Sequence, residues 1–106
     1  MAKKLTKHSL DAITPGEILR EEFLIPAVIS QTQLARAIGV PLARISDIIH
    51  SRRAITADIA ARLSIYFGTT PDLWLNLQAR YDAKTASRQM VPALLKKIRP
   101  RGMLVA

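Results

Sequence analysis

The stretch from residue 30 to residue 53 constrains the fold of this 106-residue chain more than any other. Ser30 precedes a run of periodic apolar residues, and Gln33 stands three residues later, which is the spacing of a capping box. Gly39 follows the last apolar position, where a helix commonly ends in a left-handed residue. Pro41 has a fixed φ that suits the start of another helix. The pattern predicts two short helices joined by a tight turn, over residues 31–38 and 42–50.

The apolar residues of these two helices are spaced to meet at a steep crossing. A short turn requires a small side chain at the crossing, which Ala35 supplies, and branched apolar side chains behind the second helix, which Ile45 and Ile48 supply. This is the helix-turn-helix arrangement, in which the second helix enters the major groove of DNA. The alternative is an ordinary hairpin of two helices with a solvated outer face.

The charge of the chain favours a polyanionic partner. Sixteen Lys and Arg residues oppose eight Asp and Glu residues, a formal net charge of +8. Residues 85–106 carry no acid and hold Arg88, Lys96, Lys97, Arg99 and Arg101. Residues 30–53 carry a single acid, Asp47, and hold Arg36, Arg44, Arg52 and Arg53. The basic end of the folded region is therefore the predicted helix-turn-helix.

Composition disfavours several other classes of protein. The chain has no cysteine, so disulfides and Cys-based zinc sites are excluded and a cytoplasmic setting is expected. No apolar run approaches the ~18 residues of a membrane span, and no signal-peptide pattern opens the chain. The two histidines lie far apart and the four glycines form no phosphate-binding loop. We therefore expect no enzymatic activity, no cofactor and no metal.

Capping signals predict three further helices. Thr14-Pro15-Gly16-Glu17 forms a second capping box, and Pro26 is expected to end that helix near residue 24. Thr56 caps another helix, which Gly68 closes. Thr70-Pro71-Asp72 starts a last helix that runs to about Lys84.

The chain is therefore predicted to be all-α, with a five-helix domain at 14–84. A basic arm precedes it at 1–13, and a basic tail follows it at 85–106. Within the tail, V-P-A-L-L-K-K-I at 91–98 fits either a turn of helix or an edge strand.

The exposed start of the second helix-turn-helix helix holds the candidates for reading bases. Arg44 is a candidate for bidentate bonding to guanine O6 and N7, or for a phosphate contact only. Asp47 either accepts from cytosine N4 or pairs with Arg44 on the helix surface. Ala43 or Leu42 is placed to touch a thymine methyl group.

Other residues of this region are candidates for phosphate contacts. Gln31 and Thr32 begin the first helix, where backbone N–H groups and the helix dipole favour an anion. Arg52 and Arg53 follow the second helix and either contact the flanking strand or form a solvated turn. The complete candidate DNA-binding set is Gln31, Thr32, Leu42, Ala43, Arg44, Ser46, Asp47, Arg52 and Arg53.

The helix from residue 71 carries more apolar surface than a small core is expected to cover. Trp74 and Tyr81 share one helical face with Leu77, while Leu75 and Gln78 lie partly around the side. We predict a two-fold dimer interface built from Trp74, Leu75, Gln78 and Tyr81. The alternative is that all of this surface belongs to the core of a single chain.

Three segments carry a resemblance to a known family: P-G-E-I-L-R-E-E-F-L at 15–24, S-Q-T-Q-L-A-R-A-I-G-V at 30–40 and T-P-D-L-W-L-N-L-Q-A-R-Y-D at 70–82. They resemble the HigA antitoxins of the Xre/lambda-repressor-like helix-turn-helix group. The segment W-L-N-L-Q-x-x-Y-D narrows the resemblance from the wider repressor group to HigA.

The resemblance implies a lambda-repressor-like fold and a dimeric antitoxin. Such a protein blocks a HigB-type ribosome-dependent mRNA endoribonuclease and represses the operon that encodes both, through a pseudo-palindromic operator. The operator-reading helix of the family falls on residues 42–49 here, and its phosphate-contacting helix start falls on Gln31 and Thr32. This chain has Leu42 and Ala43 where other repressors read bases with paired glutamines.

Two other functions remain open on the sequence. One is a stand-alone or phage-type repressor without a toxin partner. The other is an RNA-binding accessory protein, which is expected to have more aromatic residues than the five present here. The basic tail has three interpretations: it binds a toxin, touches DNA outside the half-site, or is a solvated end.

Overall fold

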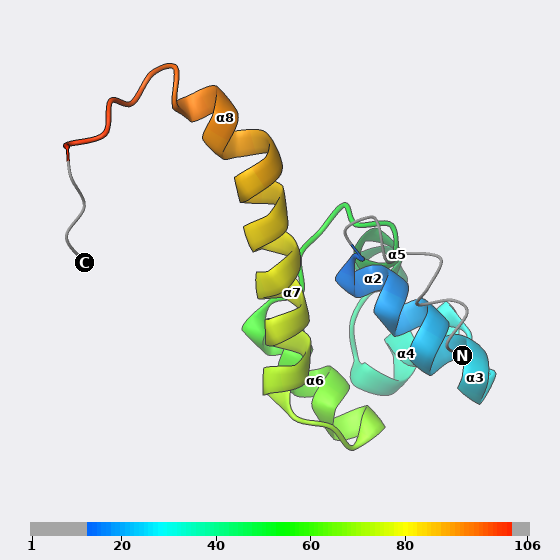
Figure 1. The fold of residues 1–106 in the computed structure, drawn as a ribbon. Helices are drawn as coiled ribbons and strands as arrows, with labels where there is room; N and C mark the ends of the chain where they lie inside the picture. Colours follow the sequence, from blue (N-terminus) through cyan, green and yellow to red (C-terminus); the bar gives the residue numbers. More distant parts are fainter. Residues whose placement is uncertain (1–12, 103–106) are drawn as a thin grey trace.

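The computed structural model describes residues 13–102, and its fold over that range is all-helical (Figure 1). The predicted basic arm lies outside the described residues except for Ile13. The helices in chain order are α2 (Pro15–Ile18), η1 (Leu19–Leu24), α3 (Ile25–Ala27), α4 (Gln31–Ile38), α5 (Leu42–Ile49), α6 (Ala57–Phe67), α7 (Pro71–Thr85), η2 (Ala86–Met90) and α8 (Val91–Leu94). The segments η1 and η2 are π-helical and join their neighbours without a break, so the described chain forms five helical rods. The predicted five-helix, all-α fold is confirmed.

The first rod runs from Pro15 to Ala27, and the prediction that Pro26 ends it near residue 24 is wrong. Proline has no N–H to donate, and its ring clashes with the carbonyl four residues earlier in an ordinary α-helix. The π-helical turn of η1 relieves both problems, because it widens the helix so that the N–H of Ile25 bonds to the carbonyl of Arg20, five residues back. The rod then ends at Val28, whose φ of 56° is left-handed.

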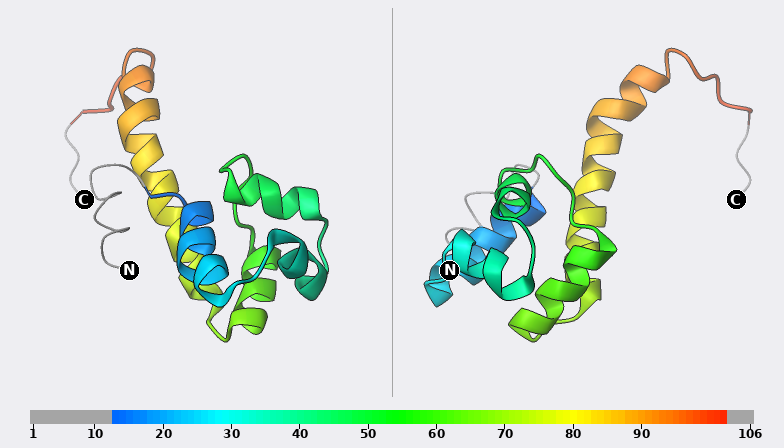
Figure 2. Two further views of the ribbon diagram at one scale, coloured as in Figure 1. Left: turned by 90° about the vertical axis from the view of Figure 1, so that its right-hand side faces the viewer. Right: turned by 180° about the vertical axis from the view of Figure 1, so that it is seen from behind.

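The last rod uses the same device at Pro92. The π-helical turn η2 precedes this proline, and the N–H of Val91 bonds to the carbonyl of Ala86. Helical bonding continues to Ile98, whose N–H lies 2.7 Å from the carbonyl oxygen of Leu94. Of the two predictions for residues 91–98, the helical turn is therefore correct and the edge strand is wrong. We call residues 86–98 the C-terminal arm, which projects away from the other rods (Figures 1 and 2).

The core draws side chains from all five rods. An aromatic cluster joins the first rod, α6 and α7: the ring of Phe23 lies 4.7 Å from that of Trp74 and 5.0 Å from that of Phe67, centroid to centroid. The indole N–H of Trp74 donates to Thr69 Oγ1 at 2.9 Å, so the buried ring leaves no polar atom unpaired. The largest fully buried side chains are Trp74, Leu19, Leu34, Ile45, Ile48, Ile59 and Leu63.

A glycine allows the first rod to touch the end of α5. A Cβ atom at Gly16 would lie 2.1 Å from the carbonyl oxygen of Ile48 and 2.7 Å from that of Ile49. Both neighbours are backbone atoms, which no change of rotamer can move. The contact therefore requires glycine at this position and fixes α5 against the rest of the fold.

Four of the rods end in the same hydrogen-bonded turn. A residue with positive φ follows each helix, and the next N–H bonds to the carbonyl five residues before it, as in a Schellman motif. Gly39 and Gly68 occupy two of these positions, as the sequence predicts. The other two are occupied by Val28 and Ser51, which the sequence does not mark.

Candidate nucleic-acid interface

The helices α4 and α5 form the predicted helix-turn-helix. Ser30 Oγ accepts the N–H of Gln33 at 3.0 Å, and Gln33 Oε1 accepts the N–H of Ser30 at 2.8 Å, so the predicted capping box is present. Ala35 and Ile45 are buried at the crossing, with 4% and 0% of their surface exposed. The packing therefore holds α5 in a fixed direction relative to α4.

The outer side of α5 is left uncovered by the described chain. Leu42 is 47% exposed and Ala43 is also exposed, while Arg44, Ser46 and Asp47 are half-buried. The five predicted base-reading residues thus lie at the start of α5, and none of them belongs to the core. A protruding helix start of this kind fits the major groove.

The start of α4 offers backbone donors to an anion. The first N–H groups of a helix have no partner within the helix, and here Ser30 takes only that of Gln33. Among the described residues, nothing accepts the N–H groups of Gln31 and Thr32. Thr32 is exposed and Gln31 is half-buried, so a phosphate oxygen can reach both N–H groups.

Asp47 is held by two arginines that follow α5. Its carboxylate accepts from Arg52 Nε at 3.1 Å and lies 3.8 Å from Arg53 Nε. The surface partners of Asp47 are therefore Arg52 and Arg53, and the predicted pairing with Arg44 is not seen in the structure. The left-handed backbone of Ser51 makes this pairing possible, because it turns the chain back toward the end of α5.

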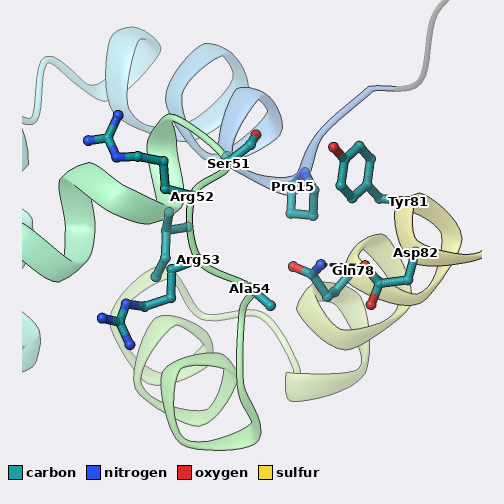
Figure 3. A pocket seen from close by; sticks show the side chains of 10 residues that line it. Pro15, Ser51, Arg52, Arg53, Ala54, Gln78, Tyr81 and Asp82 are labelled. Atoms are coloured by element: carbon teal, nitrogen blue, oxygen red, sulfur yellow. Dashed lines mark hydrogen bonds between the residues drawn. The ribbon is translucent and has the colours of Figure 1, made fainter. Parts of the chain in front are cut away.

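A shallow hollow of about 190 Å³ separates this loop from α7. In Figure 3 the guanidinium groups of Arg52 and Arg53 point away from the hollow, whereas Gln78 and Tyr81 of α7 face it. The side chains of Arg52 and Arg53 are 59% and 55% exposed. Both arginines therefore keep donors free for an external phosphate.

Arg62 is a residue that the sequence does not single out. Its Nη1 donates to the carbonyl of Ile38 at 2.7 Å, and its Nε bonds to Asp58 at 2.9 Å. A cation at the end of α4 satisfies a carbonyl and complements the helix dipole. Arg62 thereby fixes the turn between α4 and α5. The i, i+4 spacing of Asp58 and Arg62 is the only sequence signal for this, and it does not point to α4.

Comparison with known proteins agrees with this geometry. A family model described as helix-turn-helix matches residues 22–74. The chain is 49% identical over 82 residues to Virulence-associated protein I of Dichelobacter nodosus, covering 77% of this chain and 76% of that protein. It is 39% identical over 70 residues to Antitoxin HigA-1 of Vibrio cholerae, covering 66% of each. The solved structure of Pseudomonas aeruginosa antitoxin HigA with the higBA promoter matches with a TM-score of 0.78 and 41% identity, over 87% of this chain and 100% of that one.

The chain belongs to the HigA family of helix-turn-helix proteins. In this HigA-family chain, the four residues predicted to form a dimer interface do not share one surface. Trp74 is completely buried, so the prediction is corrected at this residue, whose ring fills the core. Gln78 accepts the N–H of Ile55 at 2.8 Å and donates to Asp82 at 2.9 Å, which ties α7 to the segment before α6. Leu75 is 36% exposed and Tyr81 is half-buried.

Other kinds of site find little support in residues 13–102. No group of three or more His, Cys, Asp or Glu side chains is placed there to hold a metal ion. Within the same range, no helix is both long and apolar enough to cross a bilayer.

Proposed function

We propose that this chain is the antitoxin of a HigB/HigA-type toxin–antitoxin system. As a dimer it binds the operator of its own operon in the cytoplasm, and it neutralises a ribosome-dependent mRNA endoribonuclease of the HigB type. The observation that carries the proposal is the exposed start of α5, which Ala35, Ile45 and Ile48 hold in place from behind. The HigA of P. aeruginosa, whose structure is titled with the higBA promoter, supports DNA as the ligand.

Each candidate residue takes a role in this proposal. Arg44 reads guanine, while Leu42, Ala43 and Ser46 contact neighbouring base edges or sugars. Gln31 and Thr32 bind one phosphate through backbone N–H groups. Arg52 and Arg53 bind the flanking strand, and Asp47 orients them while competing with DNA for their guanidinium groups.

Replacing Arg44 with alanine tests the reading of DNA. The variant is expected to lose about 1–3 kcal/mol of operator binding free energy and to relax specificity at one base pair. Binding to a panel of operators with single base-pair changes measures both effects. Arg80→Ala removes an exposed arginine of α7 and serves as the control. An equal loss on every DNA sequence would reassign Arg44 to a phosphate.

The arrangement of two copies on DNA provides a second test. In a dimer the two α5 helices are expected ~34 Å apart, so the half-sites of the operator repeat after about one helical turn. Protection of DNA from hydroxyl radicals measures that spacing. Purification from the native host, with identification of the small protein that accompanies the chain, tests the toxin. Recovery of the dimer on its operator without such a protein would favour a repressor that lacks a toxin.

A further inference from the structure

The C-terminal arm carries an apolar strip that nothing in the described chain covers. Five large apolar side chains are between 45% and 59% exposed, and every described residue from Ser87 to Gly102 is exposed. The strip follows the helical repeat and, together with Pro100, encloses an apolar hollow of about 250 Å³. Its members are Met90, Val91, Leu94, Leu95 and Ile98. Exposed apolar surface in a continuous strip is typical of an interface.

The charge of the arm limits what can cover the strip. Its flanks and end carry five cations, and the last acid before them is Asp82. Two arms lying side by side would bring these like charges together, which disfavours arm-on-arm pairing. The arm therefore fits an apolar surface bordered by acids.

Such a surface lies between the first rod and α7. A groove of about 520 Å³ is lined there by Ile13, Ile18, Leu77, Arg80, Tyr81, Ala83 and Lys84. Glu21, Glu22 and Ile25 follow Ile18 by three, four and seven residues, so they lie on the same side of the first rod. Arg80 and Lys84 border the groove along α7, so the cations of an occupant must face the glutamates.

We propose that the C-terminal arm of a second copy occupies this groove, and that the exchange is reciprocal. The arm cannot fold back into the groove of its own chain, because it continues the line of α7 away from the body (Figure 2). The groove reaches Lys84 and the arm begins at Ala86 of the same rod. A two-fold axis that crosses the rods near this point lays each arm along the groove of the other copy. The proposal rests on the dimer of the proposed function and gives it a surface.

Exchange of charge between the two surfaces tests this pairing in the full-length chain. Lys96→Glu with Lys97→Glu is expected to weaken the dimer at least about tenfold, and so is Glu21→Lys with Glu22→Lys. The chain that carries all four substitutions is expected to recover most of the affinity, because opposite charges again face each other. Sedimentation velocity over a range of concentrations measures the dissociation constant of each form.

Controls separate this pairing from charge alone and from unfolding. Arg36→Glu with Arg53→Glu changes the net charge by the same amount on α4 and the loop after α5, and is expected to leave the dimer intact. Leu94→Asp places a charge in the apolar strip, far from the core, and is expected to give a monomer with unchanged helical content by circular dichroism.

Two results would overturn the inference. One is a Leu94→Asp variant that remains dimeric, and the other is a four-substitution chain no stronger than its parents. If these variants dimerise normally but lose affinity for a basic toxin, the arm instead binds the toxin. The proposed function fails separately, if the wild-type chain binds neither an operator nor a toxin.

Discussion

Replacing Gly16 with alanine tests whether the contact between the first rod and α5 positions the DNA-reading helix. The added Cβ would lie 2.1 Å from the carbonyl oxygen of Ile48 and 2.7 Å from that of Ile49. The first distance is about 1 Å inside ordinary contact between a methyl carbon and an oxygen. The first rod and α5 must therefore separate for the methyl group to fit.

The expected cost follows from two opposing terms. Alanine is favoured over glycine in a helix by up to about 1 kcal/mol. Overpacking of a well-packed interior costs typically about 1–3 kcal/mol, and more where the obstacle is backbone. We expect Gly16→Ala to lower the free energy of unfolding by about 2 kcal/mol, which corresponds to a fall of roughly 8–16 °C in the midpoint of thermal unfolding.

Urea denaturation followed by circular dichroism measures this change, provided that the slope with denaturant stays constant. Gly68→Ala is the matched control. Nothing lies within 4 Å of a Cβ at residue 68, but its φ of +71° strains any side chain. This variant is expected to lose only about 1 kcal/mol. Operator binding separates the two further, because only Gly16→Ala displaces α5.

A Gly16→Ala chain with unchanged unfolding free energy would refute the reasoning. It would mean that the two rods separate at no cost, and hence that their contact does not hold α5. A large loss of stability with unaltered operator affinity would keep the steric argument and remove its link to DNA binding.

Three other substitutions test separate features. Val28→Gly is expected to raise the unfolding free energy by about 1 kcal/mol, measured by urea denaturation, because a β-branched residue at φ 56° is strained and its side chain is 86% exposed. Gln78→Leu is expected to lower it by about 1–3 kcal/mol, because the buried N–H of Ile55 loses its acceptor; exposed Gln89→Leu should change little. Asp47→Asn releases Arg52 and Arg53 and is expected to tighten binding to random DNA and steepen its salt dependence by up to about 0.9 per added phosphate contact; an unchanged salt slope would contradict this role for Asp47.

The parts of the fold that the sequence predicts depend on hydrogen bonds between residues close in the chain. A capping box joins residues three apart, so Thr14 with Glu17 and Ser30 with Gln33 are recognisable before any tertiary contact is known. The crossing of α4 and α5 is also predictable, because a short turn leaves few ways to bury Ala35 and Ile45.

The parts that the sequence does not predict depend on distant partners. Pro26 ends a helix on local grounds, and only the packing of Phe23 against Phe67 and Trp74 shows why a π-helical turn is retained before it. The same cluster explains the error at Trp74. Its surplus of apolar surface suggests an interface until Phe23 is seen to cover it.

The loop after α5 shows how one unmarked residue changes the chemistry of a site. Sequence spacing pairs Asp47 with Arg44, because residues three apart adjoin on a helix. Ser51 gives no sign of the left-handed backbone that glycine would announce, yet its φ of 61° brings Arg52 and Arg53 back to Asp47. Arg44 is thereby left without that acid. Since an arginine whose donors are free can bond a guanine in full, the turn at Ser51 strengthens Arg44 as the base-reading residue while moderating the two arginines that face phosphate.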